Sequence, residues 1–251
     1  MQKGAMIQKL NKTYRDFWLL ITTLTDGKAK NLSRQDLNVS DAPGSLGKSI
    51  LRVQSTRPFE INGLTARRRN SSQTDYDVAI EFLQDVNFDE ERSCFNVIKS
   101  NVRLLYMENY RKVKIQFQKD QTSGKVYSGV HFDFASQGTH TVDEYDHPVF
   151  HANFDLNCIE PSRLNRLNYE KPAVSRIDVP RIPTAPMDLA GVVFSVLRDH
   201  LPEKVVKGWP PKISTITENF PRYPRVTLDS CLKTDVKLSN TDWYHLNGQR
   251  N

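Results

Sequence analysis

Histidine and aspartate side chains gather in one stretch of this chain, and they are the residues best suited to chemistry. Four of the six histidines fall within 21 residues: His131, His140, His147 and His151. Imidazole and carboxylate groups serve as metal ligands and as general acids and bases. Such groups form a site only if the fold brings them together, which depends on the secondary-structure elements that carry them.

Alternation of apolar and polar residues predicts two β-strands here, at 126–134 and 149–156. The apolar face of the first holds Val130, Phe132 and Phe134, and that of the second holds Phe150, Ala152, Phe154 and Leu156. Successive side chains of a strand point to opposite faces. The polar faces therefore carry the candidate catalytic residues His131, Asp133, His151 and Asp155.

Pairing of these two strands would let the polar faces meet. Residues directly opposite on neighbouring strands have Cβ atoms about 5 Å apart, close enough to share a proton or a metal ion. His147 and His151 lie roughly 13 Å apart along an extended chain, too far for one ion. The candidate ligands of a divalent metal are then His131, His151 and Asp155. The alternative is a solvated sheet face whose polar groups bond to one another.

Other motifs point to phosphate or to no chemistry. The run Arg67, Arg68 and Arg69 is a candidate nucleic-acid contact, because guanidinium forks fit phosphate oxygens, and the alternative is a solvated strand end. The stretch 44–49 ends in Gly-Lys-Ser but lacks the glycine spacing of a phosphate-binding loop. The serine-hydrolase elbow GxSxG does not occur in the sequence.

Charge is distributed unevenly along the chain. The net charge is +6, with 13 basic against 5 acidic residues in 1–70, 8 against 15 in 71–160, and 14 against 9 in 161–251. Basic flanks around an acidic centre suit a protein partner or a nucleic acid. Three scattered cysteines, a polar N-terminus and no long apolar run predict a cytoplasmic protein without a membrane segment.

Periodicity predicts an α+β fold with a mainly antiparallel meander sheet, an amphipathic N-terminal helix and a buried helix in the C-terminal half. We expect one domain of three parts: a helical part at 1–56, a sheet at 57–158, and a proline-rich crossing, buried helix and tail at 159–251. The expected helices are 6–24, 89–103 and 187–201, and the expected strands include 74–82, 113–117, 126–134 and 149–156. Asn62-Gly63 has the sequence of a hairpin turn.

The stretch His147-Pro148-Val149-Phe150-His151, with Pro180-Arg181-Ile182 and Pro186-Met187-Asp188 downstream, resembles a pattern in uncharacterised bacterial proteins, some from mobile-element or anti-phage defence loci. The likeness covers about 45 residues. It implies a prokaryotic accessory protein and carries no chemistry to transfer.

His147-Pro148 ahead of Cys158 also resembles ubiquitin-conjugating enzymes, in which His-Pro-Asn precedes a catalytic cysteine. That resemblance would make Cys158 the nucleophile. Val149 stands where that family has its asparagine, which departs from the pattern at a residue that contributes to catalysis.

The leading hypothesis is an accessory component of a prokaryotic defence or mobile-element system that contacts a protein partner or nucleic acid. The alternative is a metal-assisted hydrolase or nuclease that uses the His/Asp sheet face. An enzyme related to the ubiquitin-conjugating family, with Cys158, is the remote alternative.

Overall fold

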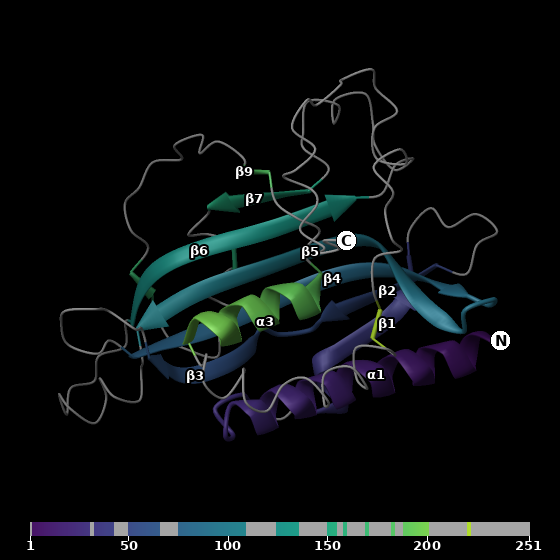
Figure 1. Cartoon of the computed structure of the whole chain (residues 1–251), viewed down its shortest axis with the longest axis horizontal. Coiled ribbons are helices and arrows are strands. Elements are labelled where there is room, and N and C mark those ends of the chain that lie inside the picture. The colour runs from purple at the N-terminus through teal and green to yellow at the C-terminus, as the bar shows by residue number, and fades with distance from the viewer. Residues whose placement is uncertain are drawn as a thin grey trace, which may run out of the picture.

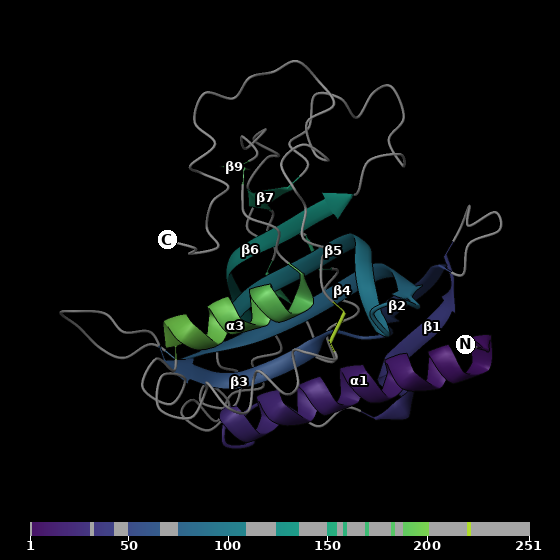
Figure 2. The same ribbon diagram turned by 45° about the vertical axis from the view of Figure 1, so that its right-hand side comes forward.

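The computed structural model describes residues 2–30, 33–42, 50–65, 75–108, 124–135, 150–154, 158–159, 169–170, 182–183, 188–200 and 220–221. Two α-helices, a short 3-10 helix (Arg34–Asp36) and a mainly antiparallel sheet make up this part, which confirms the α+β class. Figures 1 and 2 show both α-helices on the same side of the sheet.

Helix α1 (Lys3–Leu24) is the predicted amphipathic helix. Its inward stripe is buried and consists of Met6, Leu10, Tyr14, Phe17, Trp18, Leu20 and Ile21. Asp26 and Gly27 follow the helix with φ angles of 52° and 76°. These left-handed conformations reverse the chain directly after the helix.

The sheet is built from strands in the order β1-β2-β4-β5-β6-β7-β9, with each neighbouring pair antiparallel. Its long members are β4 (Asp75–Asp89), β5 (Cys94–Glu108) and β6 (Gly124–Ala135). The shorter ones are β1 (Leu37–Asp41), β2 (Ile50–Ser55), β3 (Phe59–Thr65), β7 (Phe150–Phe154), β8 (Tyr169–Glu170) and β9 (Ile182–Pro183). Strand β3 pairs with β4, and β8 pairs in parallel with β6.

Strands β2 and β3 occupy successive lengths of the same edge of β4. Residues 50–54 of β2 pair with 83–87 of β4, and 59–65 of β3 pair with 75–80. The hydroxyl of Ser55 closes the break, because it donates to the carbonyl of Phe82 (3.4 Å) and accepts from the Phe82 N–H (3.1 Å). The sheet therefore begins at Leu37, inside the part expected to be helical at 1–56, so within the described residues only the first section of that part is helical.

The helix predicted at 89–103 is wrong, because Asp89 ends β4, residues 90–93 form a turn and the rest of the segment belongs to β5. Residues 94–108 pair with 76–89 across a turn in which Ser93 has a φ of 53°. Phe95, Ile98 and Val102 share a helical spacing, but Phe95 and Val97 are both buried in a period of two. The strand period prevails because β5 pairs with β4 and so satisfies the backbone N–H and C=O groups of β4 along this edge.

Asn62-Gly63 is not a hairpin turn, which corrects a second prediction. Both residues lie inside β3, and the register with β4 shifts between Ile61 and Leu64. Gly63 has a φ of 64°, and its N–H donates to the buried carboxylate of Asp77 at 2.9 Å. The positive φ that a hairpin turn requires here serves a β-bulge.

Helix α3 (Leu189–His200) confirms the predicted buried helix. The Asp188 carboxylate accepts the Gly191 N–H at 2.8 Å and so caps its first turn. Both helices and one sheet face contribute to a single apolar core that includes Ile21, Ile80, Val193 and Leu197. The strand expected at 113–117 lies outside the described residues, as does most of the crossing at 160–186.

No helix within the described ranges is long and apolar enough to cross a membrane.

Candidate functional site

Strands β6 and β7 pair, as a site in the histidine-rich stretch requires. Asp133 lies directly opposite His151, and His131 lies directly opposite Asn153. Phe132 and Ala152 are also directly opposite, and this pair lies on the other face of the sheet, toward the helices. The side chain of His151 and all of Asp155 lie outside the described residues, as does His140. The backbone therefore places the two polar faces side by side, with Asp133 opposite His151.

Within β6, His131 and Asp133 contact each other directly. The Nε2 atom of His131 lies 3.1 Å from Oδ2 of Asp133. The other carboxylate oxygen of Asp133 accepts a hydrogen bond from the side-chain amide of Asn101 on β5. Both oxygens of Asp133 are thus engaged, and one of them orients the imidazole of His131.

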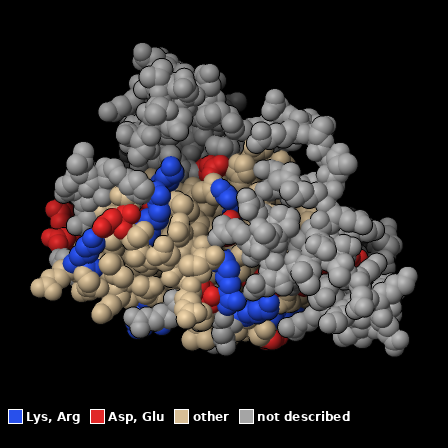
Figure 3. All heavy atoms as spheres, turned by 180° about the vertical axis from the view of Figure 1, so that it is seen from behind, with Lys and Arg blue, Asp and Glu red and all other residues tan. Residues whose placement is uncertain are grey.

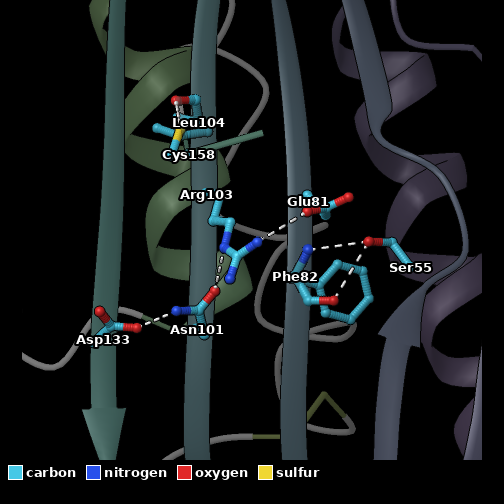
Figure 4. A network of polar contacts seen from close by, with 8 residues as sticks. All are labelled: Ser55, Glu81, Phe82, Asn101, Arg103, Leu104, Asp133 and Cys158. Carbon is cyan, nitrogen blue, oxygen red and sulfur yellow. Dashed lines mark hydrogen bonds and ion pairs between the residues drawn. The ribbon is translucent and has the colours of Figure 1, made fainter. Parts of the chain in front are cut away.

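Arg103 extends this network to a third strand. Its Nε donates to Oδ1 of Asn101 at 2.9 Å, and its Nη1 donates to Oε2 of Glu81 at 3.4 Å. Glu81 is buried, whereas the Arg103 side chain is 42% exposed. Figure 4 shows the resulting line of contacts from Glu81 on β4 through Arg103 and Asn101 on β5 to Asp133 on β6.

The strand register explains why these side chains meet. Glu81 pairs with Arg103, and Arg103 pairs in turn with His131. Asn101 pairs with Asp133 one step along the same face. Directly paired residues point to one face of a sheet, so neighbouring strands place their polar side chains in two adjacent rows. We name the set Glu81, Asn101, Arg103, His131 and Asp133 the polar network.

Sequence reasoning missed Asn101 and Arg103, because the segment 89–103 was interpreted as a helix. On a helix these two residues would have had no defined relation to His131. The signal that could have found them is the alternation of polar Asn101 and Arg103 with apolar Val102 and Leu104. Glu81 was correctly assigned to a strand.

A second ion pair lies farther along the same face. Arg52 on β2 holds Asp85 on β4 with two hydrogen bonds of 2.7 and 2.8 Å. The hydrogen bond to Asp85 raises the pKa of Arg52 above its ordinary value, despite partial burial. Seen from the side away from the helices, basic and acidic side chains of the described residues lie beside one another (Figure 3).

Cys158 lies in a small apolar cluster on this side of the sheet. Its neighbours there are Ala79, Leu105, Met107 and Ile159. The thiol is buried and donates to the carbonyl of Leu104 at 3.2 Å, as Figure 4 shows. A buried thiol that donates to a backbone carbonyl has the environment of a structural cysteine.

The other candidates are a metal site and two stretches considered for phosphate binding. Among the residues that the structure describes, no group of three or more His, Cys, Asp and Glu is arranged to hold a metal ion. Arg67, Arg68 and Arg69 lie outside the described ranges, as does the Gly-Lys-Ser stretch at 44–49.

The polar network can do two things chemically. A carboxylate that holds one nitrogen of an imidazole fixes the orientation and the tautomer of the ring, as in acid–base dyads. The guanidinium of Arg103 is partly exposed and lies directly across from the imidazole of His131, where it can bind an anion. Comparisons with protein families, with curated proteins and with solved structures find no match to this chain.

Proposed function

We propose that this protein is an accessory component of a prokaryotic defence or mobile-element system, and that it binds a macromolecular partner in the cytoplasm without catalysing a reaction. The resemblance of His147–His151 and the downstream proline motifs to proteins of such loci supports the cellular role. The partner is a protein or a nucleic acid.

One observation carries this proposal: the carboxylates of the polar face are already bound by side chains of the same sheet. Asp133 contacts His131 and Asn101, Glu81 contacts Arg103, and Asp85 contacts Arg52 through both oxygens. A metal ion bound by these carboxylates would have to displace these partners. A compensated network instead gives a rigid surface with donors and acceptors at fixed positions, which suits recognition.

A metal-assisted hydrolase or nuclease is the second candidate, and the position of Asp133 opposite His151 favours it. In that case His131, Asp133, His151 and Asp155 would hold a divalent ion that activates water or polarises a phosphate. The conversion of Cys158 into a nucleophile, as in ubiquitin-conjugating enzymes, would require the thiol to leave its buried contact with Leu104.

Metal analysis and nuclease assays on the purified protein discriminate between these functions. We expect no stoichiometric metal, and no cleavage of single- or double-stranded DNA or RNA with Mg²⁺ or Mn²⁺. His131→Ala removes a donor of the polar network and should therefore weaken partner binding, whereas the matched histidine variant His140→Ala should leave it unchanged. Metal-dependent cleavage that is lost in His131→Ala and His151→Ala but kept in His140→Ala would establish the hydrolase instead.

The Arg67–Arg69 run has its own test within the proposal. If these arginines contact phosphates, replacement of all three by alanine should weaken nucleic-acid binding and flatten its salt dependence by about 0.7–0.9 log units per lost contact. A filter-binding titration between low and moderate salt measures both quantities. If the wild-type protein binds no nucleic acid at low salt, the proposed partner is a protein.

A further inference from the structure

Four aromatic side chains gather at one end of the sheet, on the side that the helices cover. Tyr76 of β4 is at the centre. The ring centroids of Tyr106, Tyr127 and His200 lie 6.4, 5.7 and 5.8 Å from it, with interplanar angles of 89°, 77° and 71°. His200 ends α3, and its Nδ1 lies 3.4 Å from the carbonyl oxygen of Thr65 at the end of β3. Three strands and a helix therefore converge on this cluster.

Tyr127 presents its ring to solvent. This residue is 45% exposed, whereas the other three residues of the cluster are only partly accessible. The T-shaped contact with Tyr76 holds the ring in place. Burial, the Glu108 carboxylate and Tyr76 together raise the pKa of Tyr127, so its hydroxyl is neutral at physiological pH. A fixed, neutral and exposed aromatic ring is a platform on which a planar group can stack.

We infer that Tyr127, supported by Tyr76, Tyr106 and His200, is a stacking site for the bases of single-stranded nucleic acid. This inference rests on the proposed function, because it names the partner that the protein binds. Bases of single strands stack on tyrosine rings with little dependence on sequence, and a positively charged surface beside the rings guides the phosphates.

The sequence composition of the two segments that connect to this end of the sheet favours a polyanion as the partner. Thr65 and Asp75 pair here, and so do Tyr76 and Glu108, while Met107 pairs with Val126. The connecting segments 66–74 and 109–123 thus leave and rejoin the described strands at the end that holds the cluster. By sequence, the first carries three arginines and no acidic residue, and the second carries four basic residues against one acidic residue.

Glu108 provides a test of the sign of the partner's charge. It is the direct cross-strand neighbour of Tyr76, and the negative charge of its carboxylate helps to raise the pKa of Tyr127. A negative charge beside the stacking ring repels phosphates and attracts a basic peptide. Removal of that charge should therefore strengthen binding of a nucleic acid and weaken binding of a basic peptide.

The experiment is fluorescence anisotropy of the full chain with labelled oligo-dT and oligo-dA, each about 15 nucleotides long to cover one binding site, at low salt. We expect Tyr127→Ala to weaken binding about 5- to 100-fold, because stacking on one ring is lost. Tyr127→Phe keeps the ring and should bind as the wild type does. Leu19→Ala is the matched control, since Leu19 is an exposed apolar residue on α1 with 59% exposure. Glu108→Gln should bind more tightly, and circular dichroism checks that each variant is folded.

The outcomes separate this inference from the proposed function. Wild-type binding that Tyr127→Ala leaves unchanged, or that Glu108→Gln weakens, overturns the stacking site while an accessory role stands. No binding of any single strand at low salt also overturns the site and leaves a protein partner. Metal-dependent cleavage of the oligonucleotide would instead overturn the proposed non-catalytic function, whatever Tyr127 contributes.

Discussion

At the scale of single residues, the carboxylate of Asp36 ties the turn before β1 to the chain that follows β2. Asp36 is buried, accepts the Ser33 N–H at 2.6 Å and pairs with Arg57 at 2.5 Å. Burial raises the pKa of Asp36, but the hydrogen bonds from Arg57 and Ser33 outweigh it and hold the pKa below its ordinary value of 3.8. The ionised form is therefore the one that the fold favours.

This shift predicts how the contribution of Asp36 to stability depends on pH. Because the pKa is lower in the folded state than in the unfolded state, the stabilisation is complete above the unfolded pKa and is lost as pH falls through the folded pKa. Asp36→Asn should lower the free energy of unfolding at pH 7, and the difference from wild type should shrink below pH 3.8. Urea denaturation at neutral pH and at pH values on either side of 3.8 measures it. Asp41→Asn, which removes an exposed partner of Lys3, should show almost no effect.

Arg52 and Asp85 give a second prediction at this scale. Arg52→Met leaves the largely buried Asp85 carboxylate without its guanidinium, and we expect a loss of about 2–3 kcal/mol in the free energy of unfolding. The double variant Arg52→Met/Asp85→Asn removes the uncompensated charge and should recover part of the loss. Equal stability of the single and double variants by urea denaturation would contradict this expectation.

Sequence alone could predict which residues of the site share a face, but not what they bind. Alternation in period two placed His131 and Asp133 together and set His151 on the facing strand, and the register confirms this arrangement. The partners Asn101 and Arg103 could not be found once their strand was interpreted as a helix. Cross-strand contacts depend on register, which is a property of two segments and is not encoded in either one alone.

At the scale of elements, the bulge in β3 joins a backbone conformation to a buried carboxylate. Gly63 has a positive φ, and its N–H satisfies Asp77, which is fully buried. We expect Gly63→Ala to lower the free energy of unfolding by about 1–2 kcal/mol, since a side chain disfavours the left-handed region. Thermal or urea denaturation measures the loss.

Gly4 supplies the matched control for this substitution. It lies in the first turn of α1, its φ is not positive, and a methyl group added to it would meet no atom outside its own helix turn within 4 Å. Gly4→Ala should leave stability unchanged or raise it by up to about 1 kcal/mol. A similar loss in both variants would mean that the bulge has no special requirement for glycine.

The elements differ in how far sequence could predict them. The helices α1 and α3 were predictable because each has a wide apolar stripe over several turns. The bulge at Asn62-Gly63 was not, because a positive φ serves a tight turn and a bulge equally well. A bulge forms here because β4 is long enough to pair with the residues on both sides of Asn62-Gly63.

At the scale of the whole molecule, one apolar core joins α1, the sheet and α3. Phe17 of α1 contacts Phe194 of α3 and Phe220 with ring centroids 5.7 and 4.4 Å apart, and Tyr14 stacks on Phe82 of β4. The hydroxyl of Tyr14 also donates to Gln84 at 2.7 Å, and burial raises the pKa of this tyrosine well above its ordinary value. The helices and the sheet therefore depend on the same contacts.

A shared core predicts a single cooperative unfolding transition for these elements. Trp18 is buried in the core and donates to the Lys30 carbonyl at 2.6 Å, so its fluorescence reports on the packing of α1. In a variant with Trp209 and Trp243 replaced by phenylalanine, fluorescence and far-ultraviolet circular dichroism should give the same midpoint in urea. Two separate midpoints would show that α1 leaves the sheet before the strands unfold.

The division of one edge of β4 between β2 and β3 bears on how this protein can change over evolutionary time. Each short strand sets its alignment with β4 independently, and the three residues between them, Thr56, Arg57 and Pro58, belong to neither ladder. An insertion at that joint that keeps Arg57 against Asp36 can be absorbed locally, whereas the same change inside an unbroken strand would turn every later side chain to the opposite face. The joint is thus a place where lineages can gain length while the surfaces on both sides keep their side chains.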